Sequence, residues 1–148
     1  FRHRESRSAK LRRESPELFE PTSDENELQE RENHFIDFGL DEEPIGNANP
    51  RRIKSSEYKG HFARDGEVRA WVKQRADGVC EKCDQPAPFH NKFGKPFLEV
   101  HHIVPLSEGG EDIVANAVAL CPNCHRECHY GQDVEGIREL PFSKLSHQ

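Results

Sequence analysis

The sequence predicts a small α+β domain in which a helix is followed by a strand, a loop, a second strand and a final helix. Three observations predict it: short apolar runs separated by loop residues, two Cys-x-x-Cys pairs, and histidines placed between and just after those pairs. With 148 residues, of which 33% are hydrophobic, the chain can bury one modest core with polar flanks but not two large cores.

Residues 1–60 are predicted to be a charged linker or tail. Residues 1–13 are basic, residues 14–43 are rich in Glu and Asp, and residues 44–60 carry Pro, Gly, Asn and Ser. Low hydrophobicity combined with high charge favours disorder, so we expect a largely irregular segment that is flexible or belongs to a missing upstream module. The alternative is a short docking segment made of Phe35, Ile36, Phe38 and Leu40.

A helix is expected over residues 66–77. Asp65 can cap its start, and Gly78 suits its end. Apolar residues recur along it at steps of three and four: Val68, Trp71, Val72 and Ala76. This narrow stripe predicts packing onto the rest of the domain, and Trp71 is interpreted as a core residue.

Two short strands and a second helix are expected after it. The run FLEV at 97–100 predicts a strand that two histidines follow, and VAL at 118–120 predicts its partner across a loop with two glycines. The chain then turns helical over about 122–129. We place the domain at residues 61–135 and a carboxy-terminal tail at 136–148, where GIREL is either a short helical turn or a frayed end.

The two Cys-x-x-Cys pairs predict a structural zinc site. Each pair can direct two thiolates to one ion, and four thiolates complete a tetrahedral shell. The competing interpretation is two disulfides, which a reducing compartment disfavours. The four predicted ligands are Cys80, Cys83, Cys121 and Cys124. Cys128 is the odd cysteine and is expected to be a small buried thiol.

The histidine spacing predicts a second metal site. His125 and His129 stand four apart on the expected helix, so both imidazoles project from one face. His101 and His102 are adjacent at a strand and must point to opposite sides, so one of them can join that ion and the other is left out. Three imidazoles leave coordination positions open, as in a catalytic site. Ordinary surface histidines or a second structural zinc site are the alternatives.

Composition neither supports nor excludes a polyanionic partner. The net charge is −6, but residues 1–50 carry 7 basic and 13 acidic side chains, whereas residues 51–148 carry 14 of each. Attraction for phosphate in the second part must come from local patches and metal ions. No apolar run approaches the roughly 18 residues of a membrane span, and no signal-peptide pattern is present. We therefore expect a cytoplasmic protein that does not contact membranes.

These residues support a resemblance to a known family. The stretch LEVHHIVPLSEGGEDIVANAVALCPNCHRECHYG, at 98–131, resembles the HNH motif of the ββα-metal nucleases. Upstream, RDGEVRAWVKQRADGVCEKC and the APF after it resemble the nuclease domain of McrA-type restriction enzymes, which attack DNA carrying modified cytosine. The resemblance covers about 65–131 and does not reach residues 1–60.

The resemblance implies a role for each candidate residue. His102 matches the general base, Asn116 matches the middle Asn that holds the loop between the strands, and the metal ligands are His101, His125 and His129. Many relatives have Asp where this chain has His101. Without carboxylate charge the three imidazoles favour Zn, Ni, Co or Mn on softness grounds, and Mg stays open if substrate phosphate completes the shell.

The leading hypothesis is a metal-dependent DNA endonuclease of a restriction or defence system, leaving 5′-phosphate and 3′-hydroxyl ends as family members do. Its expected partners are DNA and a DNA-recognition domain in the same full-length protein. One site cuts one strand, and a homodimer is one arrangement that would cut both. The alternative is a catalytically inactive, zinc-stabilised nucleic-acid binding module, which is disfavoured because His102 would then serve no structural purpose. A secreted toxin nuclease ranks below both, because such toxins usually have a basic surface.

Overall fold

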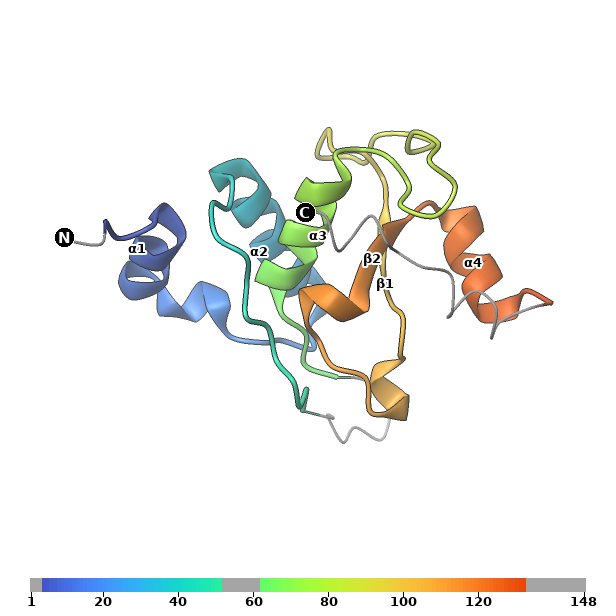
Figure 1. The fold of residues 1–148 in the computed structure, drawn as a ribbon. Helices are drawn as coiled ribbons and strands as arrows, with labels where there is room; N and C mark the ends of the chain where they lie inside the picture. Colours follow the sequence, from blue (N-terminus) through green and yellow to red (C-terminus); the bar gives the residue numbers. More distant parts are fainter. Residues whose placement is uncertain (1–3, 52–61, 133–148) are drawn as a thin grey trace.

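The computed structural model describes residues 4–51 and 62–132 (Figure 1). Its helices and strands are, in order, α1 Arg7–Glu14, η1 Pro16–Phe19, α2 Glu25–Phe38, α3 Gly66–Ala76, β1 Glu99–His102, η2 Leu106–Glu108, η3 Val114–Asn116, β2 Ala117–Leu120 and α4 Pro122–Tyr130. The two-stranded sheet lies between α3 on one side and α4 on the other (Figure 1). This confirms the expected small α+β fold and its order of elements.

The sheet pairs β1 with β2 in antiparallel register, so that Glu99 faces Leu120 and His102 faces Ala117. The expected first strand at 97–100 is therefore displaced by two residues. The reason is pairing: the amide of Phe97 donates to the carbonyl of Phe89 in the preceding loop, at 2.8 Å, and the two rings stack with centroids 4.6 Å apart. Both histidines consequently lie within the strand.

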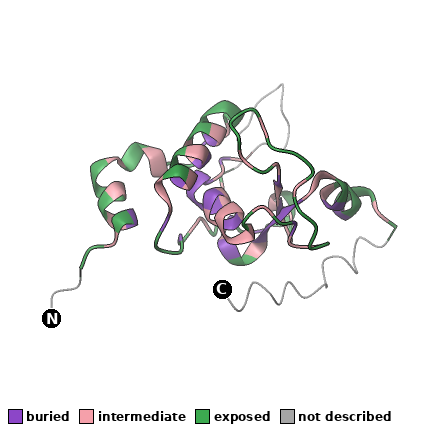
Figure 2. Ribbon diagram, turned by 90° about the horizontal axis from the view of Figure 1, so that it is seen from above, coloured by how far each residue is buried: buried purple, intermediate pink, exposed green. Residues whose placement is uncertain are grey.

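The helix α3 is the central packing element and forms as expected. The Asp65 side chain accepts hydrogen bonds from the amides of residues 67 and 68, and the helix ends at Asp77, which adopts the left-handed conformation with φ 50° before Gly78 at φ 80°. One face packs on the sheet in a cluster that includes Val68, Val72, Leu98, Val118 and Leu120. Figure 2 shows buried residues gathered along α3 and the strands.

The prediction of a largely irregular amino-terminal segment is wrong for residues 7–38, which are mostly helical. Phe35 and Leu40 bury against Ala70 of α3, and Trp71 packs against both this cluster and the one on the sheet. The apolar residues weighed as a docking segment are thus the ones that dock. What composition missed is that α3 offers an apolar face to receive them.

Charge also holds α2 on α3. Glu32 is 1% exposed, and its carboxylate accepts from Arg69 at 3.0 Å and from Lys73 at 3.1 Å. An acidic helix can therefore bury one of its carboxylates, because two cations of α3 compensate it.

The boundary predicted near residue 60 falls within 52–61, and the expected tail at 136–148 with its GIREL segment falls within 133–148, both outside the described residues. The division into segments stays a prediction. Within the described ranges, no helix combines the length and the apolar character that crossing a membrane requires.

Candidate metal centres and catalytic residues

The four predicted zinc ligands converge. Their sulfur atoms all lie within 4.8 Å of one another, and Sγ of Cys83 is 4.0 Å from Sγ of Cys121. Two thiolates bound to one zinc at about 2.3 Å lie roughly 3.8 Å apart, so this arrangement suits a tetrahedral ion. The cysteines are free rather than paired in disulfides. Cys128 lies outside the set and is buried, as expected.

The environment of Cys80 favours its thiolate. Burial disfavours the charged form, but hydrogen bonds from the backbone amides of Cys83, Cys121 and Lys82 outweigh it and lower the pKa of Cys80 to about 7. A thiolate is the form that binds metal. The donor set of this cluster fits zinc in number and type.

Glu81, which lies between Cys80 and Cys83, links this cysteine pair to β2. Its carboxylate accepts from the amide of Ala119 at 2.9 Å and from Arg75 at 2.7 Å, and Arg75 also donates to the carbonyl of Ala117 at 3.0 Å. The two Cys-x-x-Cys pairs are thus held through β2 and α3.

The second cluster consists of His101 from β1 with His125 and His129 from α4. One nitrogen of each ring lies within 4.8 Å of the others, and the Nε2 atoms of His125 and His129 are 3.1 Å apart. Two nitrogens bound to one ion at about 2.0–2.1 Å lie roughly 3.3 Å apart, so the spacing suits a shared ion. Burial and the neighbouring His125 and Arg126 lower the pKa of His129, which favours the neutral, metal-binding ring. This donor set fits a divalent transition metal.

Glu99 supplies a carboxylate that the sequence reasoning missed. It precedes His101 by two residues on β1 and so shares its face of the strand. Its Oε1 lies 3.2 Å from Nδ1 of His125. The available signal was the strand alternation itself, which places residue 99 beside any ligand at 101.

His102 does not join this cluster, because adjacent residues of a strand point to opposite faces and His101 points into the cluster. His101 is buried among the cluster rings, whereas Nε2 of His102 lies 2.9 Å from Oδ1 of Asp112. The expectation that His102 would serve no structural purpose is therefore wrong, because the ring has a partner in the loop between the strands. Asp112, 1% exposed, was also missed by sequence reasoning.

Asn116 ties that loop together. Its Oδ1 accepts from the amide of Val104 at 2.9 Å, and its Nδ2 donates to the carbonyls of Val104 at 3.0 Å and Glu111 at 2.8 Å. These three hydrogen bonds all go to backbone groups, so Asn116 helps to fix the path of the loop that connects β1 to β2.

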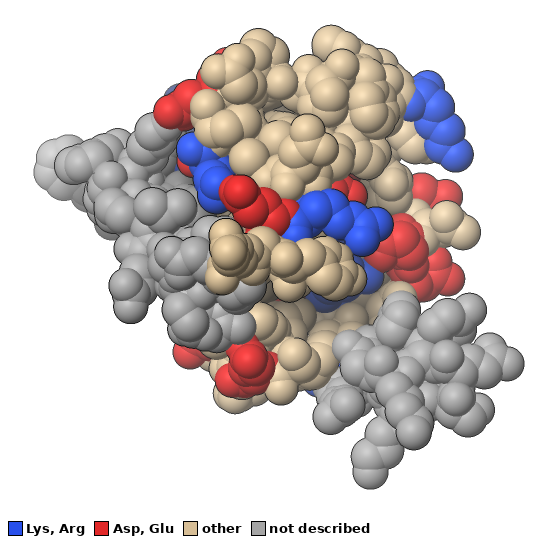
Figure 3. Space-filling view, turned by 90° about the vertical axis from the view of Figure 1, so that its right-hand side faces the viewer, with Lys and Arg blue, Asp and Glu red and all other residues tan. Residues whose placement is uncertain are grey.

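The surface around α4 carries mixed charge. Figure 3 views the molecule from that side, and on this face the basic and acidic side chains are interspersed rather than gathered into one basic patch. This agrees with the equal numbers of basic and acidic residues in 51–148.

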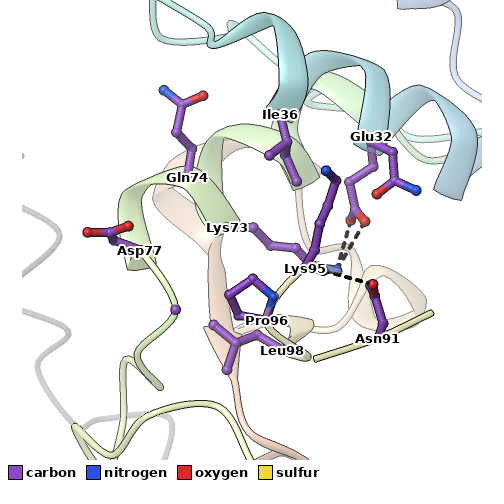
Figure 4. Close-up of a pocket in the computed structure, with 11 residues that line it drawn as sticks. Glu32, Ile36, Lys73, Gln74, Asp77, Asn91, Lys95, Pro96 and Leu98 are labelled. Carbon is purple, nitrogen blue, oxygen red and sulfur yellow. Dashed lines mark hydrogen bonds and ion pairs between the residues drawn. The ribbon is translucent and has the colours of Figure 1, made fainter. Parts of the chain in front are cut away.

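A pocket of about 190 Å³ lies elsewhere, between α2, α3 and residues 91–98. Figure 4 shows the Glu32 carboxylate and the Lys73 amine joined across it, with Pro96 and Leu98 on its lower side. None of the predicted site residues lines it. Of its other polar side chains, Lys95 pairs with Asp37 and Gln74 with the backbone of Leu40, and neither partner lines the pocket.

Known proteins resemble this chain over the segment that holds the cysteine and histidine clusters. The family model described as HNH endonuclease matches residues 80–131. The type IV methyl-directed restriction enzyme EcoKMcrA of Escherichia coli K12 is 40% identical over 136 residues, which are 92% of this chain and 48% of that protein. Anaredoxin of a Nostoc species is 47% identical over 32 residues, which are 22% of this chain and 42% of that protein.

Among solved structures, the type IV phosphorothioation-dependent restriction endonuclease ScoMcrA matches with a TM-score of 0.51 and 25% identity, over 81% of this chain and 21% of that one. The matched segments cover less than half the length of each of these relatives. The family match covers both Cys-x-x-Cys pairs and all four histidines of the site. Residues 80–131, which hold both clusters, therefore resemble the HNH endonuclease family.

Proposed function

We propose that this chain is the nuclease part of a restriction enzyme and hydrolyses phosphodiester bonds in DNA. The observation that carries the proposal is that the two adjacent histidines of β1 have different partners. His101 joins His125 and His129 in a cluster with metal-ligand spacing, while the adjacent His102 is kept out of it and held by Asp112. His102 is thus a histidine beside the metal cluster that the ion would not occupy, which is the position that a general base needs.

In this proposal His102 is the general base. It accepts the proton of a water molecule lined up opposite the leaving 3′ oxygen. A divalent ion bound by the three other histidines would stabilise negative charge as it develops on the phosphate. Asn116 keeps the path of the loop and so keeps His102 facing the phosphate. The four cysteines would hold a structural zinc that supports the fold.

Selectivity for modified DNA is assigned to another part of the full-length protein. The two restriction enzymes that resemble this chain are described by different modifications, methylation in one and phosphorothioation in the other. Their shared resemblance to one nuclease domain supports a common cutting module joined to different recognition modules. Which DNA modification the full-length protein recognises then depends on that other module.

Plasmid cleavage tests the proposal. The wild-type chain and the His102→Ala variant would each be assayed with Mg, Mn, Ni, Co or Zn on unmodified and cytosine-methylated DNA. We expect the variant to cut about 10² to 10⁴ times more slowly, the usual size of a general-base contribution, with unchanged metal content. His34→Ala, which removes an exposed histidine on α2, is the matched control and should cut normally.

If neither wild type nor variant cuts with any ion, while both bind DNA and hold one zinc, the nuclease proposal is wrong. The chain would then be the inactive binding module. Equal cleavage by wild type and His102→Ala would leave the nuclease activity in place but remove His102 from it.

A further inference from the structure

We infer that Asp112 is a positioning residue for His102, which fixes the imidazole in the tautomer that carries its hydrogen on Nε2 and leaves Nδ1 as the proton acceptor. The inference rests on the proposed role of His102 as the general base and names the group that prepares it. Asp112 itself touches no reacting atom in this proposal.

The carboxylate meets one ring nitrogen at hydrogen-bond distance. Nε2 of His102 lies 2.9 Å from Oδ1 of Asp112, and the two side chains are 14% and 1% exposed. A carboxylate only accepts hydrogen bonds, so Nε2 must donate. In the neutral ring the other nitrogen, Nδ1, then keeps its lone pair, which a general base needs.

The carboxylate is itself held in place by contacts independent of His102. Its Oδ2 accepts from the backbone amide of Asp65, at the start of α3, at 2.8 Å. Its backbone pairs in both directions with Asn47, with the two hydrogen bonds at 2.8 Å each. Asp112 is thus anchored to α3 and to the segment before residue 52, so it can impose a direction on the ring of His102.

A carboxylate is required because both of its oxygens accept. Asn has one acceptor oxygen and one donor group in the same place. In an Asp112→Asn variant, the amide group must therefore face a donor, either the amide of Asp65 or Nε2 of His102. If it faces His102, the ring is driven toward the opposite tautomer, which places its hydrogen on the nitrogen that has to accept a proton.

The first test measures the tautomer in the zinc-loaded wild-type chain. Two-bond ¹H–¹⁵N spectra recorded above pH 7.5 distinguish the two neutral forms of each histidine, and His102→Ala assigns the signal. We expect His102 to carry its hydrogen on Nε2. A ring that carries it mainly on Nδ1 would overturn the inference, even if no Asp112 variant could be made to fold.

The second test is a double-mutant cycle on cleavage. Asp112→Asn should lower kcat by at least about tenfold, and by no more than the loss of a whole general base, with KM for DNA little changed. In a His102→Ala background the same substitution should lower the residual rate no further, because its effect passes through the ring. Glu111→Gln, at the exposed neighbouring carboxylate, is the control and should leave kcat unchanged.

The outcomes separate this inference from the proposed function. If His102→Ala cuts like wild type, the role of His102 as base fails first. If His102→Ala is inactive and Asp112→Asn cuts like wild type, only the positioning inference fails. An equal loss of rate from Asp112→Asn with and without His102 would make Asp112 a structural residue and would overturn it too.

Discussion

Oε1 of Glu99 and Nδ1 of His125 lie 3.2 Å apart, so a residue of β1 holds a ring of α4 at the edge of the histidine cluster. With Nδ1 engaged by a carboxylate, Nε2 is the nitrogen left to face the cluster, where it lies 3.1 Å from Nε2 of His129. A carboxylate behind a ligand histidine orients the ring and makes it more basic. Glu99 therefore brings negative charge to a site whose ligands are all neutral.

We predict that Glu99→Gln weakens binding of a divalent ion at the histidine cluster by about 10- to 100-fold, the usual cost of losing such a partner. Titration calorimetry with Ni or Mn, on protein whose cysteine site is already filled with zinc, measures it. Glu30→Gln removes the same charge from an exposed position on α2 and is the matched control. Equal affinities in the two variants would mean that the contact with His125 has no effect on the ion.

We predict that Cys121→Ala unfolds the domain, whereas Cys128→Ala does not. Both thiols are cysteines of the same segment, but only Cys121 belongs to the four-sulfur cluster. An opened zinc shell leaves too little apolar core to hold the fold. Circular dichroism and zinc content, each measured with and without a chelator, separate the variants. If Cys121→Ala keeps wild-type dichroism and the chelator changes neither protein, the structural role of zinc is wrong.

The parts of the site that could be predicted from the sequence are those fixed by local spacing. Two residues between cysteines let both thiolates reach one ion, and a spacing of four places His125 and His129 on one helix face. The opposite directions of His101 and His102 follow in the same way from the alternation of a strand. None of these inferences needed to know which segments meet in the fold.

The parts that could not be predicted depend on contacts between distant segments. Glu32 reads as one more charge on an acidic helix, yet it is buried against residues 37 and 41 positions further along the chain. Asp112 sits in a loop, and only the path of that loop brings it to His102 and to the start of α3. A sequence shows the donors and acceptors but not which of them the fold pairs.

We predict that Glu32→Ala lowers the free energy of unfolding by about 3 kcal/mol, because it leaves two cations of α3 with their main partner removed. The side chains of Arg69 and Lys73 are only 13% and 15% exposed, so water compensates the loss incompletely. Urea unfolding followed by the fluorescence of Trp71, the one tryptophan of the chain, measures the change. Glu30→Ala is the exposed control, and equal unfolding midpoints for the two variants would contradict the role of Glu32.

We predict that Asp65 makes the stability of the domain depend on pH. Burial, chiefly, together with the charges of Asp112 and Glu67, raises the pKa of Asp65 from 3.8 to about 7, although the amides that it caps oppose the shift. A raised folded-state pKa means that the folded protein binds the proton more tightly. The stabilisation that the protonated Asp65 side chain contributes to the folded state is complete below about pH 4 and is lost as the pH rises through 7.

The Asp65→Asn variant isolates this effect, because Asn caps a helix about as well as Asp but does not titrate. The free energy of unfolding of the variant minus that of wild type should increase from pH 5.5 to pH 8, by on the order of 1–2 kcal/mol. Urea unfolding of both zinc-loaded proteins at the two pH values measures the difference. Asp24→Asn is the matched control, because Asp24 caps α2 through a hydrogen bond of the same kind but is exposed. If the stability difference between wild type and Asp65→Asn is the same at both pH values, Asp65 does not take up a proton in this range.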